Sequence, residues 1–235
     1  MPLHLYGVLD AGSAPAPSTA GIDGRVVRVL PLGDRSVWVS DIDEPTMDAT
    51  PRRLREHDAV LSAAIRAGRS PVPARVGRVY ADDIAVVAAI EAHAPELDAA
   101  MSLVRDRVEM SLLIAASNLE AREAHEAPPR DEEGAGHAHL RRIKRQLQGE
   151  RNLLAEASNL AQSIARALSE VVVAERTVED PAPPVLVARA HLIARDDTAR
   201  YLDAIEKVVA AADRELRVAV RGPGAAYSFA AVQGG

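Results

Sequence analysis

The sequence has no cysteine and very few aromatic residues. Its 235 residues include one Phe, one Trp and four Tyr. The lack of cysteine excludes a disulfide scaffold, a thiol nucleophile and any metal held by thiolates. Because aromatic side chains are scarce, a core must be built from Ala, Val, Leu and Ile. Hydrophobic residues still make up 48% of the chain, which is enough to bury a core and excludes wholesale disorder.

The chain also lacks long apolar runs and an excess of positive charge. No uncharged apolar stretch approaches the ~18 residues that a membrane span needs. The first ten residues lack the positively charged start of an export signal. The net charge of −6 argues against a dedicated nucleic-acid binder. We therefore expect a soluble, cytoplasmic protein with no membrane or nucleic-acid partner.

Familiar catalytic and phosphate-binding motifs are missing. The sequence contains no GxxxxGK[ST], GxGxxG, HExxH or GxSxG pattern. A group of His125, Glu126, His137 and His139 lies in a polar, proline-containing stretch without cysteine, and we interpret it as a solvated loop rather than a metal site. We expect no catalytic residue, no cofactor and no metal.

Two acidic pairs have a structural interpretation. Asp82-Asp83 and Asp196-Asp197 each stand directly before a segment with apolar helical periodicity. A carboxylate at that position can accept hydrogen bonds from the free N–H groups of a first helical turn. We therefore predict helix caps, in preference to Mg²⁺ ligands or acid/base catalysts.

The first half of the chain reads as strands followed by helices. Residues 3–9 form a predicted strand, and residues 25–30 and 36–40 form a hairpin around 31–34. Thr50 is a predicted N-cap before Pro51. The apolar stripe of that helix comprises His57, Val60, Leu61, Ala64 and Ile65. Residues 71–76 should be extended, and two helices should follow, carrying Ile84, Val87, Ala88 and Ile90, and then Leu97, Met101 and Val104.

The second half has a regular order of elements. From Val108 the patterns predict β-α-β-β-α-β, which is the ferredoxin-like arrangement, with a long helix whose stripe runs from Leu140 to Leu168. Each strand shows a single apolar face, so the sheet should be covered by helices on one side and be wet or partner-bound on the other. The fold class is thus α+β with two domains: an N-terminal α+β domain over 1–107, and a ferredoxin-like domain with a C-terminal tail over 108–235.

Three short segments resemble a known family. They are Leu5-Tyr6-Gly7-Val8, the stretch 71–79 (PVPARVGRV) and the stretch 222–229 (GPGAAYSF). In this order, and at this chain length, they are similar to the gas vesicle protein GvpL/GvpF family. Val76 stands where that family has Phe, and residues 224–226 replace its Trp-Pro-Pro.

The resemblance implies a function without catalysis. It implies a gas vesicle accessory or minor structural protein, located at gas vesicles in the cytoplasm, that binds the hydrophobic shell protein GvpA and assists assembly. Other gas vesicle accessory proteins are further implied partners. On this basis we predict an interaction surface, although Tyr6 and Trp38 could equally be core and Arg75 could pair with a carboxylate. The predicted interaction residues are Tyr6, Trp38, Arg75, Arg78, Tyr227 and Phe229.

Two alternatives remain open at this point. Ferredoxin-like domains host many unrelated functions, so the chain could be a small-ligand-binding protein or an enzyme unrelated to vesicles. The long apolar stripe from Leu140 to Leu168 could instead serve self-association.

Overall fold

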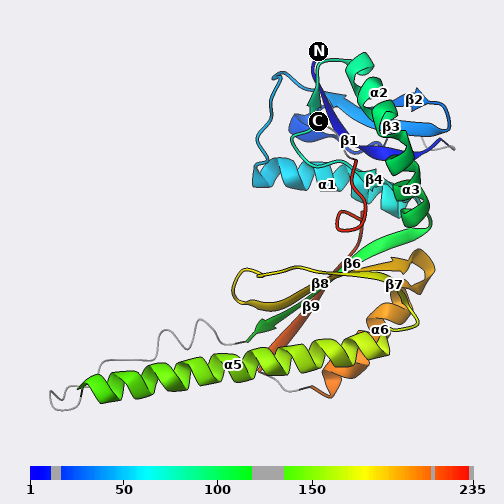
Figure 1. Cartoon of the computed structure of the whole chain (residues 1–235). Coiled ribbons are helices and arrows are strands. Elements are labelled where there is room, and N and C mark those ends of the chain that lie inside the picture. Colours follow the sequence, from blue (N-terminus) through cyan, green and yellow to red (C-terminus); the bar gives the residue numbers. More distant parts are fainter. Residues whose placement is uncertain (12–16, 118–134, 213–214, 233–235) are drawn as a thin grey trace. The chain divides into compact units, whose positions relative to one another are not determined.

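The computed structural model describes residues 1–11, 17–117, 135–212 and 215–232. The chain packs as two compact units (Figure 1). Unit 1 contains Met1–Met110, Leu192–Asp196 and Gly222–Gly235, and unit 2 contains Ser111–His191 and Asp197–Arg221. The domain boundary between residues 107 and 108 stays a prediction.

Unit 1 is built on a five-stranded sheet with strand β1 near its centre. The strands are β1 (Leu3–Asp10), β2 (Val27–Leu32), β3 (Arg35–Asp41), β4 (Val72–Pro73) and β5 (Val79–Tyr80). Their order is β2-β3-β1-β4, and β5 also pairs with β1. Strands β4 and β5 both run antiparallel to β1, with Val8 opposite Val72 and His4 opposite Val79. A short 3₁₀ helix, η1 (Ile22–Gly24), precedes β2.

The predicted hairpin is present, but its turn is tighter than expected. Pro31 and Leu32 belong to strand β2, and Leu32 pairs directly with Arg35. The connection is therefore Gly33-Asp34, where Gly33 has φ +58°. A two-residue hairpin turn favours glycine at a central position with positive φ, because a Cβ would be strained there.

Helix α1 (Pro51–Arg66) follows the sequence prediction closely. Thr50 Oγ1 accepts a hydrogen bond from Arg53 N at 3.3 Å, and Pro51 occupies the first turn. The buried residues are the predicted stripe: His57, Val60, Leu61, Ala64 and Ile65.

Helices α2 (Asp83–Ala92) and α3 (Ala94–Val104) are also where the pattern placed them. Asp82 caps α2, since its Oδ1 accepts from Ala85 N at 2.9 Å. The predicted face of α2 is wrong in part, because Val86 is buried while Ile84 is 79% exposed. Apolar residues occur all around this helix, so periodicity alone could not select its buried side. The prediction for α3 is confirmed by burial of Leu97, Met101 and Val104.

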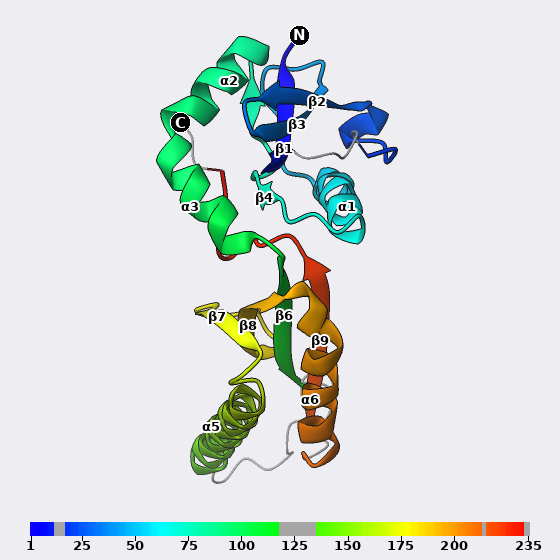
Figure 2. The same ribbon diagram turned by 90° about the vertical axis from the view of Figure 1, so that its right-hand side faces the viewer.

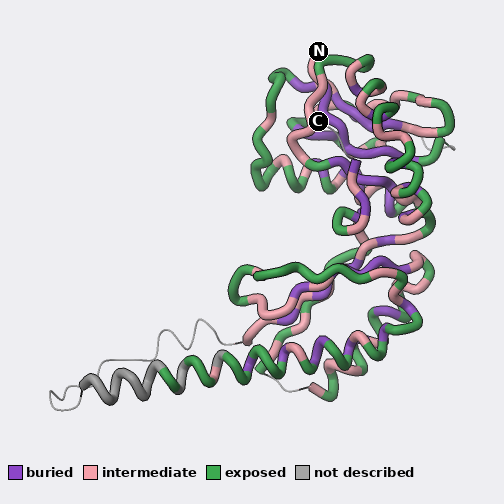
Figure 3. The backbone as a smooth tube through the Cα atoms, in the orientation of Figure 1, coloured by how far each residue is buried: buried purple, intermediate pink, exposed green. Residues whose placement is uncertain are grey.

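Both faces of the first sheet are covered. Figure 2 shows helix α1 on one side of the sheet and helices α2 and α3 on the other. Every residue of β1 from Leu3 to Leu9 is buried, which requires apolar neighbours on both faces. Buried residues concentrate in these strands (Figure 3).

The second sheet has four strands in the order β7-β8-β6-β9 and confirms the predicted β-α-β-β-α-β arrangement. Its elements, in chain order, are β6 (Arg107–Ala116), α5 (Ala135–Ala167), β7 (Val172–Thr177), β8 (Val185–Ala194), α6 (Thr198–Ala210) and β9 (Leu216–Gly224). Strand β6 alternates as predicted, with Val108, Met110, Leu112 and Ile114 buried. The fold is thus α+β with two antiparallel sheets.

Three details of the second half differ from the sequence interpretation. Helix α5 begins at Ala135, so His137 and His139 are helical, whereas His125 and Glu126 lie outside the described residues. A 3₁₀ turn, η2 (Arg195–Asp197), precedes α6, and the Asp197 side chain makes no capping hydrogen bond.

The third difference is in strand β8, where a segment that includes His191 is buried on both faces instead of having one wet face. His191 Nδ1 lies 2.7 Å from the Tyr201 hydroxyl and its Nε2 lies 3.2 Å from Glu175 Oε2. Residues 190–193 are all buried, so this part of β8 has no solvent-exposed side. Apolar–polar alternation in the sequence does not reveal such two-sided burial, since a histidine with hydrogen-bond partners can be buried.

Candidate interaction site

The segments that carry the family resemblance come together in unit 1. Gly7 and Val8 of β1 pair with Pro73 and Val72 of β4. Ala74 N donates to Tyr6 O at 2.8 Å, and Val232 N from the C-terminal tail donates to Pro73 O at 2.9 Å. These short motifs, far apart in sequence, therefore form one tertiary neighbourhood.

Gly7 permits this close approach. A Cβ built on Gly7 would lie 2.6 Å from the Val72 carbonyl oxygen, which is backbone and cannot move aside without breaking the strand pairing. The Tyr-Gly motif thus has a packing reason: glycine lets the β4 backbone lie against β1.

Tyr6 and Trp38, both predicted interaction residues, lie in the core. Tyr6 is 0% and Trp38 is 2% exposed, within a cluster that includes Leu61 and Ala225. The Tyr6 hydroxyl accepts from Ile22 N at 2.7 Å and lies 2.9 Å from Ser40 Oγ. In this structure the side chains of Tyr6 and Trp38 are part of the core of unit 1 and are not exposed.

A pair of buried histidines connects β1 with α1. His4 Nε2 and His57 Nδ1 share a hydrogen bond of 2.8 Å, and the His57 ring stacks on Tyr6 at a centroid distance of 5.2 Å. Burial lowers the pKa of His4 to about 3, with a further contribution from His57, and lowers the pKa of His57 to about 4. Both imidazoles are therefore neutral at physiological pH, as residues of a core rather than a catalytic site.

The C-terminal tail is held over α1 by a carboxylate. Glu109 Oε2 accepts from Ser228 N and Oε1 accepts from Ser228 Oγ, each at 2.8 Å. Burial raises the pKa of Glu109, although both hydrogen bonds favour its charged form. The neighbouring Tyr227 ring lies 6.3 Å from the His57 ring.

This tail forms one wall of an open apolar pocket. The pocket has a volume of about 480 Å³ and is lined by Ala49, Leu54, Asp58, Arg75, Val76 and Tyr227. Leu54 is 47% and Tyr227 is 38% exposed, so both present apolar surface to solvent. Burial of the ring, together with the Asp58 and Glu109 carboxylates, raises the pKa of Tyr227, which keeps its hydroxyl protonated.

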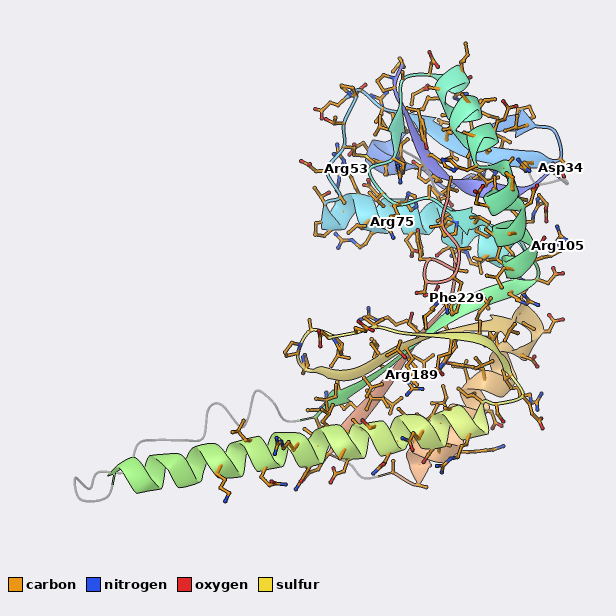
Figure 4. The ribbon with its side chains drawn as sticks, viewed as in Figure 1. Asp34, Arg53, Arg75, Arg105, Arg189 and Phe229 are labelled. Atoms are coloured by element: carbon orange, nitrogen blue, oxygen red, sulfur yellow. The ribbon has the colours of Figure 1, made fainter. Side chains whose placement is uncertain are left out.

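The structure brings together two of the predicted interaction residues, Arg75 and Tyr227. Arg75 is exposed and lies beside helix α1 (Figure 4). Arg78 lies between β4 and β5, where its carbonyl accepts from Leu5 N at 3.1 Å. Phe229 is half-buried in the tail, where its N–H donates to Ala226 O, and it does not line the pocket.

Sequence reasoning missed Leu54 and Asp58. Leu54 stands three residues before His57 and seven before Leu61, so it continues the apolar stripe of α1 by one turn. That extra turn is not covered by the sheet. The apolar stripe of α1 is one turn longer than its buried part, and this extra length could have indicated Leu54 as an exposed apolar residue.

Two other types of site find no support in the part of the chain that the structure describes. No group of three His, Asp or Glu side chains there is arranged to hold a metal ion. Among the same residues, no helix combines the length and the apolarity required to cross a membrane.

Comparison with solved structures shows a shared fold. The crystal structure of the gas vesicle protein GvpF from Anabaena sp. PCC7120 is similar over 99% of this chain and 97% of its own, with a TM-score of 0.79 and 21% identity. Gas vesicle protein GvpF from Microcystis aeruginosa is similar over 97% and 98%, with a TM-score of 0.75 and 20% identity.

Comparison of sequences extends this similarity to a family. Gas vesicle protein L of Streptomyces sp. (strain CB03234) is 29% identical over 97% of this chain and 92% of its own length. Gas vesicle protein F of the same strain is 28% identical over 97% and 99%. The family model described as gas vesicle synthesis protein GvpL/GvpF matches residues 2–231. The chain therefore belongs to the gas vesicle protein GvpL/GvpF family.

Proposed function

We propose that this chain is a gas vesicle accessory protein that binds the hydrophobic shell protein GvpA in the cytoplasm and assists vesicle assembly. It acts by contact rather than by bond-making chemistry. The interaction surface is the pocket between α1, the segment after β4 and the C-terminal tail, where Arg75 and Tyr227 meet.

One observation carries this proposal: unit 1 has an open pocket with apolar walls. Leu54 and Tyr227 are exposed and Val76 is half-buried, so each keeps apolar surface that a partner could cover. Exposed apolar surface rimmed by polar groups is typical of protein–protein interaction sites.

The physical need for such a site follows from the partner. A shell subunit with an apolar face aggregates in water unless that face is covered before assembly. A pocket that accepts apolar side chains from the subunit lowers the exposed apolar area of both proteins.

The test is co-expression with the GvpA of the same organism, followed by pull-down. We expect soluble GvpA to increase and to be retained by the chain. Leu54→Asp should reduce retention at least tenfold, because it places a charge in the apolar pocket. Leu202→Asp is the matched control, since Leu202 lies on helix α6, does not line the pocket and is 44% exposed. Lack of any association, or equal loss with both variants, would contradict the proposal.

A further inference from the structure

We propose that the pocket recognises an apolar side chain that has a carboxylate beside it, with Arg75 as the residue that pairs with that carboxylate. This inference rests on the proposed function, since it assigns the chemistry of the partner at the same pocket.

The apolar residues that line the pocket favour an apolar group in the ligand. Carbon surface is supplied by Ala49, Leu54, Val76 and the Tyr227 ring, and the volume of about 480 Å³ is within the range of small-ligand binding pockets. An aliphatic chain entering there replaces water against apolar atoms, which is favourable without any polar contact.

The charged part of the ligand follows from Arg75. Other arginines of unit 1 bind carboxylates of the chain itself: Arg25 with Asp43, Arg28 with Asp83, Arg35 with Asp98, and Arg52 and Arg53 with Asp23. Arg75, like Arg55 and Arg66, forms no ion pair with the residues that the structure describes, and of these three arginines it is the one that lines the pocket. A guanidinium at the rim of an apolar pocket has donors spaced for the two oxygens of one carboxylate.

Asp58 determines on which side of the pocket the carboxylate of the ligand lies. It lines the same pocket, and its Oδ2 accepts a hydrogen bond from Ser62 Oγ at 3.5 Å. Asp58 repels an incoming carboxylate, so the acid of the ligand must lie on the Arg75 side. The two residues should therefore have opposite effects on an anionic ligand, which a general loss of stability would not produce.

The test uses small probes with the full-length chain. Hexanoate, hexanol and hexylammonium share one alkyl chain and differ in charge, and their binding is followed by NMR shifts of Ala49, Val76 and Tyr227. We expect hexanoate to bind at least threefold more tightly than hexanol, and hexylammonium to bind less tightly than hexanoate. Arg75→Gln should abolish the preference for hexanoate without changing the affinity for hexanol. Asp58→Asn should strengthen hexanoate binding about twofold or more. Arg55→Gln is the control, because it removes an arginine of α1 that does not line the pocket.

The outcomes separate this inference from the proposed function. Equal binding of hexanoate and hexanol, preference for hexylammonium, an unchanged preference in Arg75→Gln, or no shift with any probe would overturn the inference. If Leu54→Asp abolishes GvpA retention while Arg75→Gln preserves it, the proposed function stands and the carboxylate assignment fails. A dimer that Leu54→Asp converts to a monomer would assign the pocket to a second copy of this chain, and would also overturn the inference.

Discussion

At the scale of single residues, the most constrained group is the buried histidine pair. His4 and His57 are both 0% exposed and share one hydrogen bond between strand β1 and helix α1. His4 Nδ1 and His57 Nε2 have no hydrogen-bond partner of good geometry in the described part of the chain. A proton added to either ring would therefore create a poorly solvated charge in the core.

This pair predicts acid sensitivity. Burial lowers the pKa of His4 to about 3 and that of His57 to about 4, from 6.5. The unfolded chain takes up protons below pH 6.5 before the native chain does, so stability is full above that pH and falls as the pH falls. Between pH 7.5 and pH 5 we expect a loss of about 2 kcal/mol per histidine in the free energy of unfolding. Urea unfolding followed by Trp38 fluorescence measures it. The double variant His4→Leu/His57→Met should lose much less over the same range, and an equal loss would contradict the assignment.

At the scale of elements, helix α1 has two tasks. Its stripe packs on the sheet, while Leu54 in its first turn and Asp58 about one turn later line the pocket. The Thr50 cap holds that first turn, since Thr50 Oγ1 accepts from Arg53 N and Thr50 O accepts from Leu54 N. Stability of the helix end and shape of the pocket are therefore linked.

The Thr50 cap can be tested by comparing it with Asp197, which stands at the start of α6 without a capping hydrogen bond. Thr50→Ala should lower the free energy of unfolding by about 1 kcal/mol, because it removes a side-chain acceptor from the helix N-terminus. Asp197→Ala at the start of α6 should cost less than half as much, because Asp197 makes no capping hydrogen bond. Chemical denaturation of both variants at pH 7.5 gives the comparison. An equal or larger cost for Asp197→Ala would show that the cap at Thr50 is not what stabilises α1.

Helix α5 has apolar side chains exposed on its stripe. Its 33 residues would extend about 50 Å, and Leu147 and Leu154 on its stripe are 54% and 49% exposed. Among the described residues of the stripe, the later ones are buried: Ala157, Leu160, Ala161, Ile164 and Leu168. Self-association through the exposed part stays a prediction.

At the scale of the whole molecule, the C-terminal tail is part of the N-terminal unit. Ala225, Ala226, Ala230 and Val232 are buried, and Ala225 belongs to the same core cluster as Tyr6. Unit 1 is therefore complete only with residues from both ends of the chain.

Removal of the tail should unfold or weaken unit 1. A chain that ends at Gly224 loses the Ser228–Glu109 hydrogen bonds, the Val232–Pro73 bond and one wall of the pocket. We expect a loss of about 3 kcal/mol or more, since a hydrogen bond to a charged group contributes about 1.5–3 kcal/mol and apolar burial adds to it. Thermal unfolding followed by circular dichroism measures the effect. A chain that ends at Val232 is the control and should match the full chain. If both truncations unfold at the same temperature, the tail contributes no stability.

Local sequence patterns predict much of the fold. The stripe of α1, the Asp82 cap, the alternation of β6 and the β-α-β-β-α-β order depend on neighbours within a few residues, so the sequence alone predicts them. The predictions for Ile84, Asp197 and the second face of β8 were wrong for the same reason: exposure, capping and two-sided burial depend on what packs against these residues.

The pocket could not be predicted from local sequence patterns. Leu54, Arg75 and Tyr227 come from a helix, the segment after β4 and the tail, and no period in the sequence relates them. Tyr6 and Trp38 could be surface or core by sequence, and the packing of α1 and the tail on the sheet makes both core residues. Local chemistry sets which helices and strands form, because backbone hydrogen bonds and side-chain spacing act over short distances. Which apolar residues remain exposed depends on packing between segments far apart in the sequence, so only the tertiary structure decides it.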